Sequence, residues 1–191
     1  FGDFHDFSKI QADLIVRTPA VNPSRLLKNT KITSVTNLFF EKCPAPIIGV
    51  TGSKGKGTVS SFIAEILRAA GLRVHLVGNI GLPALNDLSK IQKDDAVIYE
   101  LSSFQLWDAQ KSPHIAVLNN LEVDHLDVHD GFKDYVAAKM NIAKNQTEND
   151  FFIFNAENPI VLKNVENLKS QLKAELQPFQ NYNLAHIQEN Y

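Results

Sequence analysis

Cysteine is nearly absent from this sequence: Cys43 is the only one in 191 residues. A single thiol excludes an internal disulfide framework and is typical of proteins in a reducing compartment. Long apolar runs are absent too, because none approaches the roughly 20 residues that a membrane-spanning helix needs. We therefore expect a cytoplasmic protein with no membrane partner.

The sequence also lacks an excess of charge of either sign. Its 19 basic and 21 acidic residues give a formal net charge of −2, which gives no reason to expect a basic surface for nucleic acid. We expect no nucleic-acid partner, and we expect a monomer. What is present, 44% hydrophobic and 21% charged residues, is the composition of an ordinary globular protein of one domain or slightly more.

Short β-rich runs alternate with longer helical patterns along the chain. That alternation predicts an α/β fold, with a mostly parallel sheet of the P-loop type and helices on both of its faces. The expected strands are 12–18, 31–35, 46–51, 73–78, 96–102, 114–120 and 151–155. The expected helices are 57–70, about 131–147 and 159–170. The first of these helices carries one apolar stripe, which should face the sheet: Val59, Phe62, Ile63, Ile66 and Leu67.

Prolines interrupt the segment 39–47 just before a predicted strand, which indicates a domain boundary. Residues 1–40 hold two strands, too few to fold alone, so we interpret them as the tail of a preceding domain. Residues 41–191 form the principal domain. Because the chain begins with Phe1 and ends in a helical pattern, we expect a fragment of a longer protein.

The segment GVTGSKGKGTVSS (49–61) is close to a phosphate-binding loop but departs from its pattern twice. That pattern is Gly, four residues, then Gly-Lys-Ser/Thr. Val50 stands where the first Gly belongs, and Gly57 stands where the hydroxyl belongs. The context still fits, because an apolar strand leads into the turn and an amphipathic helix, whose N-terminus attracts anions, follows it. The alternative, a plain turn with a surface lysine, does not require that context, so we predict a nucleotide site.

Within this loop, each residue type suits a phosphate ligand. Gly52, Gly55 and Gly57 permit positive φ angles and close approach of the backbone. Lys56 is placed to reach the outer phosphates, and Thr58, one position late, offers a hydroxyl to Mg²⁺.

Polar segments follow several predicted strands at their carboxyl ends, where open α/β sheets bind ligands. With the loop, they resemble the Mur ligase family in five motifs: VTGSKGKGT, GNIGLPAL, ELSSFQL, DHLD and AAK. SSFQL and NIGLPAL are similar to the branch of that family that adds D-glutamate. The related folate polyglutamate ligases, which commonly share the displaced hydroxyl of Gly57-Thr58, are the alternative enzyme interpretation.

The resemblance implies ATP-dependent amide formation in the synthesis of a peptidoglycan precursor. With Mg²⁺, the complete enzyme would join UDP-N-acetylmuramoyl-L-alanine to D-glutamate through an acyl phosphate, which requires cations and positioned donors. Residues 1–40 would be the end of a Rossmann-like N-terminal substrate domain with its linker, and 41–191 the ATP-binding central domain. The C-terminal amino-acid-binding domain would be absent, so we expect the chain alone not to ligate.

Residue roles also follow from the resemblance. The loop would bind ATP through Gly52, Ser53, Lys54, Gly55, Lys56, Gly57 and Thr58. Glu100, otherwise a solvated carboxylate at a strand end, would bind Mg²⁺ together with Thr58. His125, otherwise part of a polar loop, would bind a second metal ion or orient the acyl phosphate. Lys139, otherwise a solvated charge on a helix, would be carbamylated and bind metal, and Lys56, His125 and Lys139 would be the catalytic residues.

Carbamylation requires a neutral amine, so it predicts that burial or neighbouring groups favour loss of the proton from Lys139. Neutral side chains would contact the nucleotide-sugar substrate: Asn79, Ser102, Ser103 and Gln105. For the two serines, ordinary hydrogen bonds within the loop are the alternative. Asn190 would contact adenine, although Ile187 replaces the asparagine usual in that segment. Two other classes stay open: a free-standing module that turns over ATP by itself, and a ligase-derived scaffold without catalysis.

Overall fold

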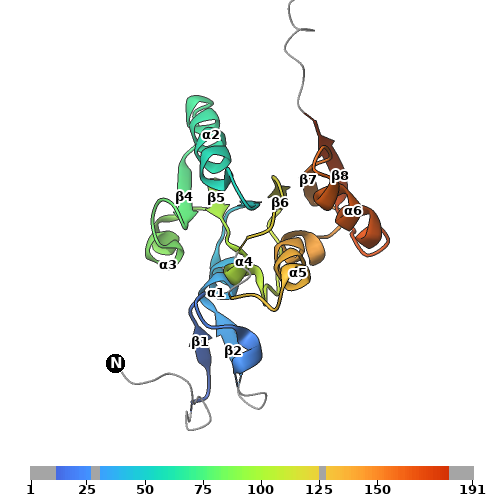
Figure 1. Ribbon diagram of the computed structural model, residues 1–191. Helices are drawn as coiled ribbons and strands as arrows, with labels where there is room; N and C mark the ends of the chain where they lie inside the picture. The colour runs from blue at the N-terminus through green and yellow to red at the C-terminus, as the bar shows by residue number, and fades with distance from the viewer. Residues whose placement is uncertain (1–11, 27–30, 125–127, 181–191) are drawn as a thin grey trace, which may run out of the picture.

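The computed structural model describes residues 12–26, 31–124 and 128–180, and its main feature is a parallel sheet of six strands (Figure 1). In the order β4-β5-β3-β6-β7-β8, these strands are Val74–Gly78, Ala96–Glu100, Ile47–Thr51, Ile115–Leu118, Phe151–Asn155 and Glu175–Phe179. A separate parallel pair joins β1 (Ile15–Arg17) to β2 (Ile32–Ser34). The α-helices are α1 (Val35–Lys42), α2 (Lys56–Ala69), α3 (Ala84–Asp87), α4 (Ser103–Leu106), α5 (Phe132–Lys144) and α6 (Pro159–Leu168). None of these described helices is long and apolar enough to cross a membrane.

Helices cover both faces of the main sheet, as predicted. On one face, Val59, Ile63 and Leu67 of α2 pack against sheet residues such as Val50 and Ile98. The other face carries the larger core, to which α1, α5 and α6 contribute. Among its fully buried side chains are Phe39, Tyr99, Leu118, Tyr135, Ile142 and Phe152. The inner strands read as apolar runs because they are covered on both sides.

The structure confirms all seven predicted strands and the three predicted helices, with bounds that shift by a few residues. It adds α1, α3, α4 and β8, which the sequence analysis missed. β8 contains Pro178 and mostly polar or half-exposed positions, because it lies at the sheet edge, so it shows no apolar run. α3 and α4 have four residues each, too few to show a helical period.

The predicted apolar stripe on α2 was wrong in two of its five members. Phe62 and Ile66 are 65% and 67% exposed, whereas Val59, Ile63 and Leu67 face the sheet. Each residue advances about 100° around a helix. A stripe that includes the two exposed residues as well as the three buried ones is therefore wider than the part of α2 that the sheet covers.

Helix α1 runs across residue 41, where the sequence placed a domain boundary. Its Phe39 is fully buried, and the Phe39 and Tyr99 rings meet edge-to-face with centroids 5.1 Å apart. Ser34 caps the helix by accepting a hydrogen bond from the backbone N–H of Asn37. The division into domains stays a prediction, but α1 packs with the residues that follow it.

A buried histidine attaches α3 and the turn before β5 to strand β4. His75 lies in β4, with Nδ1 at 2.6 Å from Asp87 Oδ2 and Nε2 at 2.8 Å from Asp95 Oδ2. Hydrogen bonds from His75 lower the pKa of Asp87, and those from the Gln92 backbone N–H and from His75 lower the pKa of Asp95. The cluster fixes the far end of the connection that carries Asn79.

At the centre of the sheet, Gly49 of β3 lies against Pro113, which precedes β6. A Cβ at position 49 would stand 2.7 Å from Pro113 Cγ and 3.3 Å from Leu101 Cδ1. The backbone of β3 and the proline ring therefore share a space that no side chain can enter without a shift.

Candidate nucleotide site

Strand β3 leads directly into the glycine-rich loop and the N-terminus of α2. Thr51 ends the strand and α2 begins at Lys56. The residue before the helix is Gly55, which makes no side-chain cap. The first N–H groups of an α-helix have no acceptor within the helix, and the positive end of the helix dipole lies beside them. The local fold therefore forms an anion site over this loop.

Two of the three loop glycines are required by the backbone. Gly52 has φ 153° and Gly55 has φ 76°, a region that other residues rarely adopt. A Cβ on Gly55 would also stand 2.8 Å from Asn119 Nδ2. The expectation of positive φ at Gly57 was wrong, because Gly57 already belongs to the first turn of α2. A Cβ there would meet Ile80 at 3.6 Å, an ordinary contact distance.

The segment after β6 holds the loop in place. Asn120 accepts hydrogen bonds from the backbone N–H groups of Ser53 at 2.8 Å and Lys54 at 3.0 Å. Asn119 Nδ2 donates to Lys54 O at 2.9 Å. The Ser53 hydroxyl lies 2.8 Å from the Tyr135 hydroxyl. The Ser53 side chain thus stabilises the loop itself, and binding of phosphate by Ser53 and Lys54 stays a prediction.

Glu100, at the end of β5, is a buried carboxylate between cations. It is 3% exposed, and burial raises its pKa, while the Lys56 ammonium, a hydrogen bond from Asn79 and the Lys139 side chain lower it. Within the described part of the chain, Glu100 Oε2 has no hydrogen-bond partner. Lys56 itself donates from Nζ to Ser53 O at 3.1 Å. The solvated-carboxylate alternative for Glu100 is therefore wrong.

Lys139, on α5, is buried, which favours its predicted modification. It is 2% exposed, and its Nζ donates to Gly52 O at 2.8 Å and lies 4.8 Å from the centre of the Tyr135 ring. Burial, followed by repulsion from Lys56, lowers the pKa of Lys139 to about 7, with Asp124 and Glu100 acting in the opposite direction. A neutral amine is thus available near neutral pH, and carbamylation stays a prediction.

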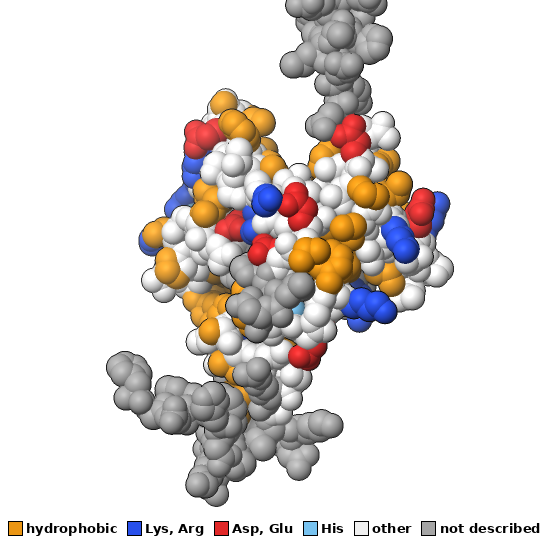
Figure 2. All heavy atoms as spheres, in the orientation of Figure 1, with side chains coloured by type: hydrophobic (Ala, Val, Ile, Leu, Met, Phe, Trp, Pro, Cys, Tyr) orange, Lys and Arg blue, Asp and Glu red, His pale blue; other side chains and the backbone are white. Residues whose placement is uncertain are grey.

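A pocket of about 280 Å³ brings Lys56 and Lys139 together with several of the predicted substrate contacts. Its lining residues are Pro19, Lys56, Asn79, Ser102, Ser103, Phe104, Tyr135 and Lys139. Figure 2 shows basic and acidic side chains gathered on this face of the molecule, between α2 and α5. The pocket therefore joins the end of the loop to the start of α4.

Gln105 is not brought into this pocket with the other predicted substrate contacts. Its Oε1 accepts hydrogen bonds from the backbone N–H of Ser102 at 2.8 Å and from the Ser102 hydroxyl at 3.0 Å. The two residues form a capping box that begins α4. The structure gives Gln105 a role in the helix, and its contact to substrate stays a prediction.

Several other predicted site residues do not line the pocket, among them Glu100 and the loop residues other than Lys56. His125 and Asn190 lie outside the described residues. Thr58 is described and exposed in the first turn of α2. Among residues 12–26, 31–124 and 128–180, no group of three or more His, Cys, Asp and Glu side chains has a metal-binding arrangement. The second metal ion therefore stays a prediction.

Sequence reasoning missed Tyr135, and it left His129 without a site role. Tyr135 lies one helical turn before Lys139, a spacing that places both on one face of α5. His129 Nδ1 lies 2.7 Å from Asp134 Oδ2, and its Nε2 lies 2.9 Å from Ser103 Oγ. The ring also packs on Trp107 with centroids 4.5 Å apart. His129 thus connects α4 to α5 beneath the pocket.

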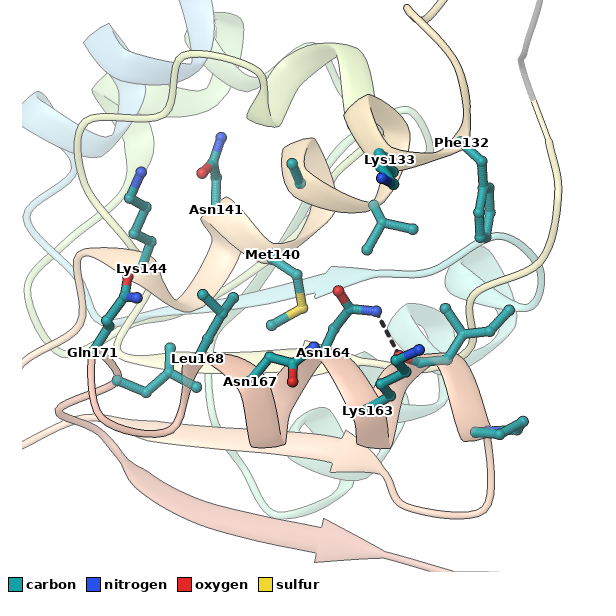
Figure 3. Close-up of a pocket in the computed structure, with 15 residues that line it drawn as sticks. Phe132, Lys133, Met140, Asn141, Lys144, Lys163, Asn164, Asn167, Leu168 and Gln171 are labelled. Atoms are coloured by element: carbon teal, nitrogen blue, oxygen red, sulfur yellow. Dashed lines mark hydrogen bonds between the residues drawn. The ribbon is translucent and has the colours of Figure 1, made fainter.

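A larger cavity, about 730 Å³, lies elsewhere, between α5 and α6 (Figure 3). Met140 and Leu168 contribute to its apolar floor, and the cations on its lining are Lys133, Lys144 and Lys163. None of the predicted site residues lines it. Size alone would select the wrong cavity, because Lys56 at the end of the glycine loop and the buried Lys139 line the smaller one.

The residues of the smaller pocket, together with Glu100 and the glycine loop beside it, fit a nucleotide with a divalent cation. A buried carboxylate oxygen without a protein partner is the kind of ligand that Mg²⁺ binds. The Gly52 and Gly55 backbone leaves no room for side chains where it approaches Asn119 and Asn120. Lys56 and the N-terminus of α2 supply positive charge for phosphates.

Comparison with known proteins finds one family. The profile of the Mur ligase middle domain matches residues 50–189. UDP-N-acetylmuramoylalanine–D-glutamate ligase of Acetivibrio thermocellus is 42% identical over 154 residues, which are 78% of this chain and 33% of the relative. The same-named protein of Streptococcus mutans is 39% identical over 165 residues, 84% of this chain and 36% of the relative. The chain thus spans about a third of the length of these curated relatives.

Solved structures share the fold at lower identity. UDP-N-acetylmuramate:L-alanyl-gamma-D-glutamyl-meso-diaminopimelate ligase from Neisseria meningitides has a TM-score of 0.61 at 20% identity, covering 88% of this chain and 58% of its own. MurF ligase from Thermotoga maritima, in complex with ADP, has a TM-score of 0.56 at 20% identity, covering 92% and 49%. E. coli FolC in complex with DHPP and ADP has a TM-score of 0.54 at 18% identity, covering 75% and 45%.

Proposed function

Because the chain belongs to the Mur ligase family, we propose that the protein is an ATP-dependent ligase that joins UDP-N-acetylmuramoyl-L-alanine to D-glutamate. The relatives of about 40% identity carry the name of that activity, and a solved neighbour holds ADP. The reaction would serve cell-wall synthesis in the cytoplasm. The chain spans about a third of the length of these relatives, and their names are what support D-glutamate as the amino-acid substrate.

The observation that carries the proposal is the buried Glu100 carboxylate beside Lys56 and Lys139, at the glycine loop. A carboxylate between two lysines, with one oxygen unpaired, is costly unless a ligand completes the site. Mg²⁺ bound by Glu100 and the Thr58 hydroxyl would supply a Lewis acid that neutralises phosphate charge. A nucleotide with its cation would pair Mg²⁺ with the free Glu100 oxygen and phosphate with Lys56, which neither a neutral ligand nor an anion alone would do.

Under this proposal, the predicted site residues have the following tasks. Lys56 and the first N–H groups of α2 would bind and orient the outer phosphates. Lys139, as a carbamate, would present a carboxylate-like group toward the metal instead of a cation. Asn79, Ser102 and Ser103 would donate hydrogen bonds to the nucleotide-sugar. His125 and Asn190 keep their predicted roles, toward a metal or acyl phosphate and toward adenine.

Calorimetric titration of Mg·ATP into the chain tests the phosphate site. We expect Lys56→Ala to weaken binding at least about tenfold, because it removes a charge-assisted contact. Lys42→Ala is the matched control: Lys42, at the end of α1, is exposed and paired with Glu41 at 2.8 Å, so its removal should change binding less than about threefold. Equal losses in the two variants, or none in either, would contradict this assignment.

Ligation itself is tested with the protein encoded by the complete gene. ADP release should require both UDP-N-acetylmuramoyl-L-alanine and D-glutamate. The folate polyglutamate alternative, supported by the likeness to FolC and by Gly57-Thr58, predicts turnover with a folate and L-glutamate instead. ATP hydrolysis without either pair of substrates would support the free-standing module.

A further inference from the structure

The Arg17 side chain joins the N-terminal segment to the end of α4. It is 2% exposed, and its Nε donates to Asp108 Oδ2 at 2.7 Å while Nη2 donates to Asp108 Oδ1. Nη2 also donates to Phe104 O at 3.1 Å, and Nη1 donates at 3.3 Å to the carbonyl groups of Thr18 and Val21. All three guanidinium nitrogens are therefore engaged, in a planar fork that lysine does not present.

These contacts connect the two sides of the smaller pocket. Pro19, next to Thr18, lines the pocket from the N-terminal segment, and Ser103 and Phe104 line it from α4. The guanidinium donates hydrogen bonds to both sides of the pocket, to the N-terminal segment at Thr18 and to α4 at Phe104. A bidentate pair of this kind defines geometry more strictly than a surface ion pair, because its two parallel hydrogen bonds fix the relative orientation of the side chains and the Arg17 side chain is buried.

Helix α1 supports the same junction through a separate side chain. Asn37 Nδ2 donates to Asp108 O at 2.9 Å, and Asn37 Oδ1 accepts from the Gln110 backbone N–H at 2.9 Å. The glycine loop, by contrast, is held by Asn119 and Asn120. The two ends of the pocket thus have independent supports.

We propose that Arg17 and Asp108 are positioning residues that fix Pro19 against Phe104 and so set the affinity of the pocket for the nucleotide-sugar substrate. This inference rests on the proposed function. Because the Arg17 contacts do not include the glycine loop, they control the affinity for the nucleotide-sugar and leave ATP binding unchanged.

Steady-state kinetics of Arg17→Lys and Asp108→Asn, in the protein encoded by the complete gene, test the inference. We expect KM for UDP-N-acetylmuramoyl-L-alanine to rise roughly tenfold in each variant, the loss of about one charge-assisted hydrogen bond. KM for ATP and kcat should stay within about twofold, and the double variant should be no worse than either single one, because the two residues act as a unit. Arg68→Lys is the matched control, since Arg68 forms an exposed pair with Glu65 on α2.

The inference would be overturned if KM for ATP rose and kcat fell as much as KM for the nucleotide-sugar rises. It would also be overturned if KM for the nucleotide-sugar did not change. Lysine keeps the charge of Arg17, so full activity in Arg17→Lys would also overturn it.

Hydrogen exchange separates the inference from the proposed function. In Arg17→Lys, the peptide that covers residues 15–22 should exchange faster, while the peptide that covers 49–61 should not change. If the two proteins differ in that way but the wild type does not ligate, the proposed function fails and the positioning stands. If residues 15–22 exchange equally in both proteins, the positioning fails whatever the ligation assay gives.

Discussion

At Lys139, burial and a neighbouring ammonium both favour loss of the proton. Together they lower the pKa of Lys139 to about 7, so the neutral amine gains population as pH rises through that value. An exposed lysine reaches the same state only near its ordinary pKa of 10.5. CO₂ reacts with the neutral amine, which releases a proton, and the resulting carbamate would replace the positive charge beside Glu100 with a second acidic group able to hold a metal ion.

We predict that Lys139 forms a carbamate in buffer with ¹³C-labelled bicarbonate at about pH 8, observed as a carbonyl signal by NMR. The signal should fall as pH is lowered through about 7, because the amine becomes protonated. Lys139→Arg should abolish it. Lys144→Arg, on the exposed side of the same helix, should not. A signal that persists in Lys139→Arg would exclude this residue as its source.

The residue scale is also where sequence reasoning has its clearest limit. Lys139 on a helix reads as a solvated charge until the AAK motif is matched to a family, because burial on α5 depends on Tyr135 and on Gly52, which lies 87 positions away. Gln105 shows the reverse case. Its motif indicated a substrate contact, but its side chain closes the first turn of α4.

At the scale of elements, α1 decides how the N-terminal segment is attached. The helix has eight residues, and Phe39 and Phe40 both belong to the larger core. Short helices of this length are held by tertiary packing more than by their own propensity. Removing an aromatic ring from α1 should therefore affect the folding of the whole sheet, not of α1 alone.

Phe39→Ala should lower the free energy of unfolding by about 3–5 kcal/mol, because it removes a fully buried ring and leaves a cavity. Phe62→Ala is the matched control, since that ring on α2 is mostly exposed and its loss should cost less than about 0.5 kcal/mol. Urea unfolding, followed by circular dichroism, measures both. Similar losses in the two variants would mean that the packing of α1 on Tyr99 contributes little.

The inner elements were predictable because their period or apolar run is complete within each segment. β3, β5, β6 and the long helices α2 and α5 have that property. β8 does not, since the edge position leaves it half-exposed. The exposed Phe62 and Ile66 were misjudged for a related reason: which side of a helix meets the sheet is settled by tertiary packing, which the periodicity of α2 alone does not contain.

At the scale of the whole molecule, two cavities lie on different sides of α5. The smaller one meets the glycine loop, and the larger one faces α6 (Figure 3). The chemistry of their linings separates them, because Lys56 at the N-terminus of α2 and the buried Lys139 line the smaller one. The larger is an apolar groove with lysines, and none of the predicted site residues lines it.

We predict that Asn167→Trp, which places a bulky ring at the larger cavity, changes the affinity for Mg·ATP by less than about twofold, since distant sites act independently. Calorimetric titration beside Lys56→Ala measures the difference. Weaker binding in Asn167→Trp, with an unchanged melting temperature, would connect the larger cavity to the nucleotide.

The contact between Gly49 and Pro113 has a consequence for the history of the sequence. The two residues lie 64 positions apart but are in contact, so position 49 cannot gain a side chain by itself. A lineage that gained a side chain at 49 would survive only after a smaller, more compliant residue had appeared at 113. Among descendants of this gene, we expect a side chain at 49 only where Pro113 has already been replaced, as a record of the order in which substitutions were tolerated.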